Sequence, residues 1–300
     1  MLRVCWLNWI SSRLVVPWLL FMWFTTACAD INPRNISAKE RGLYIFELAG
    51  CKECHTEPEG NFLAGGRALE TPFGVFYSPN ITPHPTRGIG SWKLQDFHRA
   101  LRHGVSPDGG DYYPVFPFAS YTGMTDADIY DLWAYLRSIP AVDRLNREHQ
   151  LKFPFNIRPL MWGWKLLFFE SKPFETDVSR SDLWNRGAYI VRALAHCGEC
   201  HTPRNRFGAM NLDRELGGNP KGPDGDVVPN ITPDKATGIG GWSVADLDSL
   251  LEIGMLPDAD FVGSSMGDVV DNSTSNLTAY DRSAVIEFVR TLPAVFDARN

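Results

Sequence analysis

Two short stretches decide how this sequence is interpreted, Cys51-Lys52-Glu53-Cys54-His55-Thr56 and Cys197-Gly198-Glu199-Cys200-His201-Thr202. Each stretch holds two cysteines three positions apart, with a histidine directly after the second cysteine. Three positions make nearly one turn of an α-helix, so both thiols of a pair can reach the same edge of a flat ligand. The histidine that follows is then carried to one face of that ligand.

The pattern Cys-x-x-Cys-His is the attachment signature of a c-type haem, in which both thiols form thioethers and the histidine binds the iron. We expect thioether links at Cys51, Cys54, Cys197 and Cys200, and proximal iron ligands at His55 and His201. The sequence therefore predicts two covalently bound haem c groups.

Zinc binding, thiol redox chemistry and structural disulfides fit the cysteine pairs less well. A zinc site needs its pairs close together, whereas these lie 143 positions apart (197 − 54). A thioredoxin-like redox pair needs a βαβ context, which is missing. Structural disulfides form after export, but a two-residue loop followed each time by histidine is unusual for them.

The chain is an internal repeat. The stretch 79–83, Pro-Asn-Ile-Thr-Pro, recurs at 229–233, and Gly-Ile-Gly-Ser-Trp at 88–92 recurs as Gly-Ile-Gly-Gly-Trp at 238–242. Motif order and spacing match throughout, which indicates a duplication. Each copy contains one cysteine pair.

The helix signals predict an all-α fold with long loops. Capping patterns occur at Ser37 with Glu40, Thr125 with Asp128, and Thr278 with Asp281, and further helical stretches are expected near 93–102 and 244–253. No stretch alternates convincingly between apolar and polar residues, so we predict no strands.

The first 29 residues are typical of an export signal, with an apolar run at 14–24 and a small-x-small site at Ala27-Cys28-Ala29. We predict cleavage after Ala29 and a periplasmic protein. Lipid attachment at Cys28 and retention as an uncleaved anchor are the alternatives. The formal net charge of −6 and the lack of a basic cluster argue against nucleic acid as a partner.

The predicted organisation is a signal peptide at 1–29, a first domain at 30–140, a connection at 141–181 and a second domain at 182–300. The connection is rich in Phe and Trp, so it is no flexible polar linker. It either packs between the domains or forms a docking surface for a partner or a membrane, as the apolar run at 166–169 favours.

The sixth iron ligand is expected to be a methionine thioether, which suits electron transfer. In the second repeat the candidate is Met266, in a loop before the last helix. In the first repeat the 150-residue offset (230 − 80) leads to Phe116, which cannot bind iron. The nearest candidate there is Met124. The remaining options are Met161, His84, His98, His103 or no ligand at all, and His196 is expected only to pack in a loop or face solvent.

Several residues of the repeated loops either contact the haem edge and propionates or merely shape the turns. They are Arg67, Asn80, Trp92, Asn230 and Trp242.

These motifs, together with Tyr112-Tyr113-Pro114-Val115-Phe116-Pro117-Phe118 and the stretch 263–271, resemble the multihaem cytochrome c subunits of periplasmic alcohol, gluconate and nicotinate dehydrogenases. The resemblance covers most of the chain from about residue 40 onward. Those subunits are often trihaem, so this chain is similar to a shortened, dihaem version. Some have a methionine placed like Met124. The resemblance implies two tandem cytochrome c domains and electron transfer from a dehydrogenase to the respiratory chain.

Three functions are compatible with these features. The first is an electron carrier that is not itself an enzyme, whose partners are a periplasmic or membrane-bound dehydrogenase and a downstream electron acceptor. Any membrane association would then come through the partner. The second is a dihaem oxidoreductase, similar to a thiosulfate dehydrogenase or a peroxidase, with an open site at the first haem because of Phe116. The third is a haem-based gas sensor, which would also need an open iron position.

Overall fold

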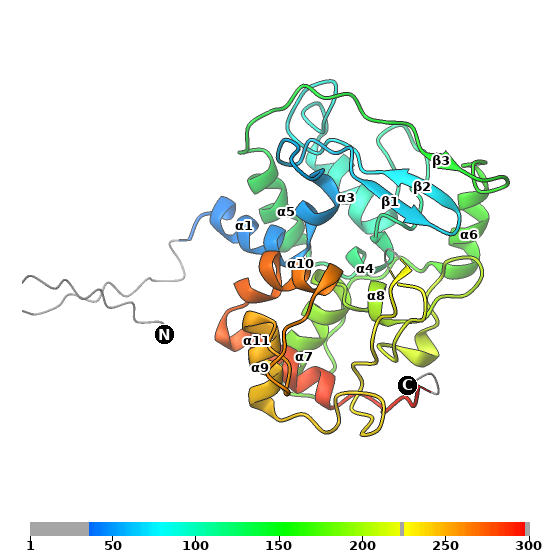
Figure 1. The fold of residues 1–300 in the computed structure, drawn as a ribbon. Coiled ribbons are helices and arrows are strands. Elements are labelled where there is room, and N and C mark those ends of the chain that lie inside the picture. The colour runs from blue at the N-terminus through cyan, green and yellow to red at the C-terminus, as the bar shows by residue number, and fades with distance from the viewer. Residues whose placement is uncertain (1–35, 223–224, 298–300) are drawn as a thin grey trace, which may run out of the picture. The chain divides into compact units, whose positions relative to one another are not determined.

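The computed structural model describes residues 36–222 and 225–297. The predicted signal peptide at 1–29 lies outside the described residues. From Ala38 onward the contacts group the chain into one compact unit that holds both repeats. Figure 1 shows the first repeat, blue to green, beside the second, yellow to red, with α4, α8 and α10 near their junction. The domain boundaries at 140 and 182 stay predictions of the sequence.

Helices dominate the regular structure, as the sequence predicts. The α-helices are α1 (Ala38–Leu48), α2 (Cys51–His55), α3 (Leu94–His103), α4 (Phe118–Tyr121), α5 (Asp126–Leu136), α6 (Leu160–Phe168), α7 (Asp182–Tyr189), α8 (Gly198–His201), α9 (Val244–Ile253), α10 (Ser264–Asn272) and α11 (Ala279–Arg290). The described residues also contain a π-helical turn, η2 (Ile190–Leu194), and the 3₁₀ turns η3 (Leu212–Arg214) and η5 (Thr274–Asn276).

The predicted caps of the last helix in each repeat are confirmed. The amide of Asp128 donates to the hydroxyl of Thr125 at 3.1 Å ahead of α5, and the amide of Asp281 donates to Thr278 at 3.1 Å ahead of α11. Each bond satisfies one of the unpaired amides at a helix N-terminus.

The first and last helices of each repeat cross at a glycine. A Cβ on Gly42 of α1 would lie 1.9 Å from the carbonyl oxygen of Asp131 in α5, and one on Gly187 of α7 would lie 1.9 Å from that of Ala284 in α11. Only a residue without a side chain permits so close an approach. The crossing holds each predicted attachment helix, α2 or α8, at the end of a tightly packed helix pair.

The second repeat has one extra residue ahead of its cysteines. From the crossing glycine to the first cysteine there are 9 steps in the first repeat (51 − 42) and 10 in the second (197 − 187). The π-helical turn η2 absorbs the addition, since the amide of Ala195 donates to the carbonyl of Ile190, five residues back, at 2.7 Å. A single-residue insertion in a helix is commonly accommodated as such a π-bulge.

The prediction of no strands was wrong for one small antiparallel sheet. It contains β1 (Ala68–Thr71), β2 (Gly74–Tyr77) and β3 (Gln150–Leu151), in the order β1-β2-β3. Thr71 pairs with Gly74 in the hairpin, and Gly74 pairs with Leu151. Four-residue strands are too short to show alternation, and β3 comes from the connection, 76 positions beyond Gly74 (150 − 74).

The main apolar core is shared by the two repeats. Its fully buried members include Leu48, Met124 and Leu132 from the first repeat, and Leu194 and Phe288 from the second. A separate small cluster joins Phe76, Tyr113 and Met161 beside the sheet. The shared core explains why the contacts do not divide the repeats.

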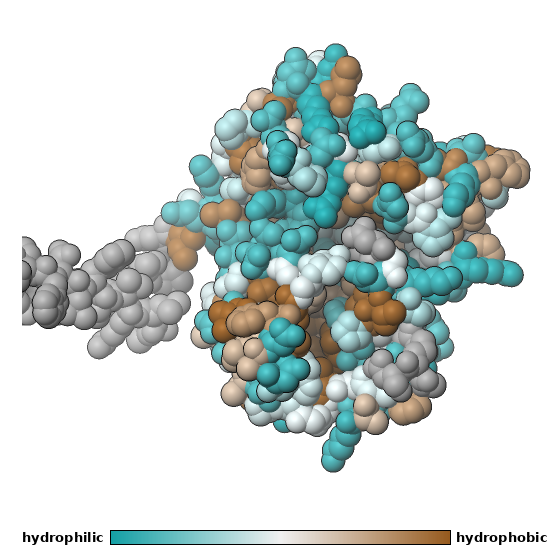
Figure 2. Space-filling view, viewed as in Figure 1, coloured by the Kyte–Doolittle hydropathy of each residue, from teal (hydrophilic) through white to brown (hydrophobic). Residues whose placement is uncertain are grey.

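The connection at 141–181 is packed in part and exposed in part. Trp164 of α6 donates its indole N–H to the carbonyl of Phe207 at 2.9 Å. In contrast, Phe153 is 80% exposed, Leu166 70% and Leu167 73%. Figure 2 shows apolar colours at the end of the molecule where Figure 1 labels β3 and α6. Within the described residues, no helix combines the length and the apolar character needed to span a bilayer.

Candidate haem sites

Each cysteine pair lies on a short helix. Cys51 and Cys54 lie on α2, while Cys197 caps α8 and Cys200 lies within it. Within the described residues, none of the four forms a disulfide. Both sulfurs of a pair thus come from one helical turn, as attachment to one edge of a haem requires.

The two histidines are oriented alike. Nδ1 of His55 lies 2.7 Å from the carbonyl oxygen of Pro79, and Nδ1 of His201 lies 2.9 Å from that of Pro229. A carbonyl only accepts, so Nδ1 carries the hydrogen and Nε2 keeps its lone pair. Histidines that bind metals usually donate their other ring N–H in this way. Both residues therefore fit the role of iron ligand.

Burial lowers the pKa of both imidazoles, His55 and His201, against the opposing effect of the carbonyl bond. The neutral imidazole is the form that binds iron. The doubled Pro-Asn-Ile-Thr-Pro motif thereby acquires a physical role, because its first proline supplies the carbonyl that orients the ligand.

The thiols are held in their neutral form. Burial raises the pKa of Cys54 to about 11, with Glu53 and then, more weakly, Cys200 adding to the rise. Burial likewise raises the pKa of Cys200 to about 11, with Glu199 adding to it. Thiols that exchange disulfides have lowered pKa values instead. The raised pKa values therefore argue against a redox-active pair.

The two asparagines of the repeated loops serve the turns. The side-chain amide of Asn80 donates to the carbonyl of Val142 at 2.8 Å, and that of Asn230 donates to Val295 at 2.6 Å. Each Oδ1 accepts from the amide and hydroxyl of the threonine two positions on. Both side chains are thus occupied by the chain itself, which agrees with the turn-shaping interpretation and not with contact to a haem.

Arg67 lies beside the first attachment helix. It lines a pocket of about 240 Å³ together with Lys52, Glu53 and Asp268. Arg67 and Lys52 are the cations of this pocket, and either is suited to a haem propionate. Trp92 and Trp242 pack, half-buried, against the main core.

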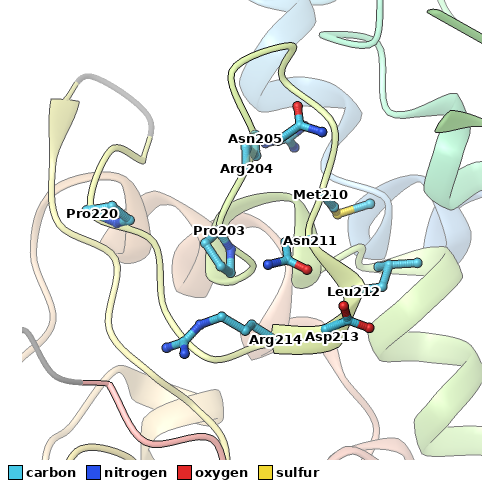
Figure 3. A pocket seen from close by; sticks show the side chains of 9 residues that line it. All are labelled: Pro203, Arg204, Asn205, Met210, Asn211, Leu212, Asp213, Arg214 and Pro220. Atoms are coloured by element: carbon cyan, nitrogen blue, oxygen red, sulfur yellow. The ribbon is translucent and has the colours of Figure 1, made fainter. Parts of the chain in front are cut away.

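A second pocket, of about 620 Å³, adjoins the other attachment helix (Figure 3). Its wall is formed by Pro203, Arg204, Asn205, Met210, Asn211, Leu212, Asp213, Arg214 and Pro220. None of the four cysteines or two ligand histidines lines it. It is therefore a surface feature next to the second site and not the haem crevice itself.

The 150-residue offset between the repeats is also found in the structure, in the loops that precede Phe116 and Met266. The amide of Tyr112 donates to Gly104 at 2.8 Å, and the amide of Val262, 150 residues on (262 − 112), donates to Gly254 at 2.9 Å. Beyond this point the repeats differ, because Phe116 precedes α4 (Phe118–Tyr121) whereas Met266 lies within α10 (Ser264–Asn272). Met266 itself lies half-buried in the first turn of α10. Its role as the sixth ligand of the second haem stays a prediction.

Met124 is fully buried in the main core, against which Cys51 also packs. The other sulfur candidate, Met161, belongs to the separate cluster beside the sheet. The histidine candidates have other partners: His84 bonds to Arg87, His98 to Asp126 and His103 to Ser171. These placements favour Met124 as the ligand at the first site, which stays a prediction.

His196, expected only to pack in a loop or face solvent, contacts the first repeat. Its Nε2 lies 3.2 Å from the carbonyl oxygen of Ala49, 147 residues away. The same oxygen accepts from the hydroxyl of Tyr121 at 2.6 Å. Two features of the sequence could have indicated this contact: the extra residue in the second repeat, and a histidine where the first repeat has Gly50.

Comparison with known proteins shows the family to which the chain belongs. The sequence model of the Cytochrome c family matches residues 40–140. The chain is 43% identical over 261 residues to the "Diheme cytochrome c-type" protein of Cereibacter sphaeroides, and the alignment covers 85% of this chain and 86% of the relative. The chain therefore belongs to the cytochrome c family, which binds haem c covalently.

Its other relatives include cytochrome subunits of dehydrogenases. It is 42% identical to the fructose dehydrogenase cytochrome subunit of Gluconobacter japonicus, across 85% of this chain and 52% of that protein. It is 34% identical to the cytochrome c subunit of the quinone alcohol dehydrogenase of Gluconobacter oxydans, across 87% of this chain and 56% of that protein. The chain spans about half the length of these two subunits.

Proposed function

We propose that the protein is a periplasmic electron carrier with two covalently bound haem c groups, one in each repeat. It accepts electrons from a partner dehydrogenase and delivers them towards the respiratory chain. The observation that carries this proposal is the equivalence of the two sites. Each offers a cysteine pair on one helical turn and a histidine whose Nδ1–H is bound to a carbonyl, which leaves Nε2 for iron.

Haem, when bound, supplies one-electron chemistry, and the protein sets its orientation, potential and burial. His55 and His201 are oriented for ligation by Pro79 and Pro229. Met266 and Met124 are the proposed sixth ligands, and their thioethers would fill the remaining iron position. Such a carrier needs neither a general base nor a substrate cleft. The relatives of the chain include a dihaem cytochrome and cytochrome subunits of dehydrogenases.

The proposed architecture is two tandem cytochrome c domains, residues 30–140 and 182–300, joined by the connection at 141–181. The doubled helix crossings at Gly42 and Gly187 support it. Membrane association would come through the partner dehydrogenase or through processing of the export segment.

The test is to produce the full chain with covalent haem attachment, count its haems and mix it with candidate dehydrogenases. We expect two haems per chain, and reduction of the oxidised protein by a fructose, alcohol or gluconate dehydrogenase supplied with its substrate. Turnover of thiosulfate or peroxide by the chain alone, without reduction by any dehydrogenase, would instead favour the catalytic alternative.

A further inference from the structure

The residue just before the first cysteine differs between the repeats in identity but not in backbone conformation. Gly50 has φ 60° ahead of Cys51, and His196 has φ 41° ahead of Cys197. The left-handed region suits glycine, because a Cβ there approaches the following carbonyl. A histidine keeps this conformation only where its surroundings hold it. Its side chain is therefore expected to do something that glycine cannot.

The extra residue of the second repeat lies within the π-helical turn η2, a few residues before His196. Because of it, the amide of Cys197 donates to the carbonyl of Val191, six residues back, at 2.9 Å. At equivalent positions, the amide of Ala195 donates to Ile190, five residues back, at 2.7 Å, whereas the amide of Ala49 in the first repeat donates to Ile45, four residues back, at 2.9 Å. The wider turn and the histidine thus both occur only in the second repeat, within a few residues of each other.

The imidazole of His196 reaches the other repeat. Its Nε2 lies 3.2 Å from the carbonyl oxygen of Ala49, to which the hydroxyl of Tyr121 also donates at 2.6 Å. The rings of His196 and Tyr121 meet edge to face, with 5.3 Å between centroids. A carbonyl can only accept, so Nε2 carries a hydrogen. Ala49 follows the end of α1, where helix carbonyls need outside partners.

Two further bonds tie the same region together. Ser273 donates its hydroxyl to the carbonyl of Leu48 at 3.2 Å, and Ser120 donates to the carboxylate of Glu199 at 2.5 Å. Thus the end of α1, α4 and the second attachment helix α8 are linked in one hydrogen-bonded junction. Ala49 is two residues from Cys51, and His196 is one residue from Cys197.

We propose that His196 and Tyr121 are positioning residues that hold the two haem attachment segments at a fixed separation, and so set the rate of electron exchange between the haems. This rests on the proposed function, in which both sites hold haem. From Cys51 the chain reaches the carbonyl of Ala49, crosses one hydrogen bond to His196 and continues directly into Cys197. A single electron passes from one haem to the other, and no bond forms or breaks and no proton moves.

The experiment uses the isolated two-haem protein and a photogenerated one-electron reductant, so that no dehydrogenase is involved. Redistribution of the electron between the haems is followed after the flash. In His196→Gly the backbone keeps the conformation that Gly50 adopts but the bond to Ala49 is lost. We expect that rate to fall by at least about tenfold, as for other reactions that depend on a held geometry. Tyr121→Phe, which removes only the hydroxyl, should give a smaller fall.

Ala259→Gly is the matched control, because Ala259 also has positive φ, 66°, but lies exposed in another loop. It should relax similar backbone strain without changing the rate. A second readout is the electron paramagnetic resonance of the fully oxidised protein, in which the magnetic interaction between the haems should weaken only in the His196 and Tyr121 variants.

An unchanged rate and unchanged resonance in His196→Gly, with two haems still attached, would overturn the proposal. Haem counting on the same samples separates this result from failure of the proposed function, which would show as fewer than two haems in the unaltered chain or as no reduction by any dehydrogenase.

Discussion

The hydroxyl of Tyr44 donates a hydrogen bond of 2.6 Å to the carboxylate of Asp281, 237 residues further along the chain. The equivalent bond runs in the opposite direction, from Tyr189 of the second repeat to the carboxylate of Asp128 in the first. Each tyrosine also accepts the amide of the capping threonine, Thr278 or Thr125, of the other repeat's last helix. A pair of equivalent bonds therefore joins the repeats, and each begins on the helix that precedes a cysteine pair.

We expect Tyr44→Phe to lower the free energy of unfolding by about 1–2 kcal/mol, since it leaves the buried carboxylate of Asp281 with one partner fewer. Asp281 keeps its ion pair with Arg186 at 2.7 Å, which limits the loss. Denaturant unfolding measures the effect. Tyr280→Phe is the control, because Tyr280 lies on α11, the helix of Asp281, and is 57% exposed. Equal effects of the two substitutions would contradict the role given to the bond.

Stability should also fall in alkaline solution. Burial raises the pKa of Tyr44 to about 12. An unfolded tyrosine loses its proton near pH 10, so above that pH the folded state binds more protons than the unfolded state, and the free energy of unfolding decreases until about pH 12.

Unfolding measured from about pH 9 to about pH 11 tests this slope. It should be shallower in Tyr44→Phe. It should not vanish, because burial raises the pKa of Tyr112 to about 12 and that of Tyr189 as well. A slope that Tyr44→Phe leaves unchanged would count against the contribution of this group.

The helix crossing at Gly42 should not tolerate a methyl group. Gly42→Ala would place Cβ 1.9 Å from the carbonyl of Asp131, so α1 and α5 must separate. We expect a loss of about 3 kcal/mol or more, despite the roughly 1 kcal/mol by which alanine exceeds glycine in helix propensity. Gly163→Ala in α6 is the control, since its Cβ meets nothing within 4 Å, and it should stabilise slightly. Thermal unfolding of both variants decides the matter.

Carbon monoxide binding to the reduced protein tests the sixth ligands. With Met124 and Met266 bound, neither haem should react. Met124→Leu keeps the volume of a fully buried side chain, which should hold its cost below about 1.5 kcal/mol, but removes the thioether. About half of the haem absorption should then shift. Reaction of half the haem in the unaltered protein would show that Phe116 leaves the first site open.

The double substitution Cys51→Ser and Cys54→Ser should reduce the covalent haem from two groups to one per chain. The matched change, Cys197→Ser with Cys200→Ser, should remove the other group. Absorption of the alkaline pyridine complex, set against protein concentration, gives the count. Retention of two covalent haems in either variant would disprove the assignment of the cysteine pairs.

Local features were predictable because their causes are local. The caps at Thr125 and Thr278 form as their sequence patterns predicted. The helix expected at 244–253 is α9, and the one expected near 93–102 is displaced by one residue, to 94–103. The small sheet was missed because β1 and β2 are too short to show alternation, and because β3 pairs across 77 positions (151 − 74), a contact that no local pattern encodes.

By itself, the sequence determined the two attachment motifs, the duplication and the helices that frame each site, since a pair of thiols on one turn and a capped helix depend only on near neighbours. Only the tertiary structure decided that Pro79 and Pro229 orient the histidines, that Tyr44 and Tyr189 cross between the repeats, and that His196 meets Ala49. These contacts join residues 24 to 237 positions apart, and their geometry follows from helix crossings and a shared core that form only when the whole chain is packed.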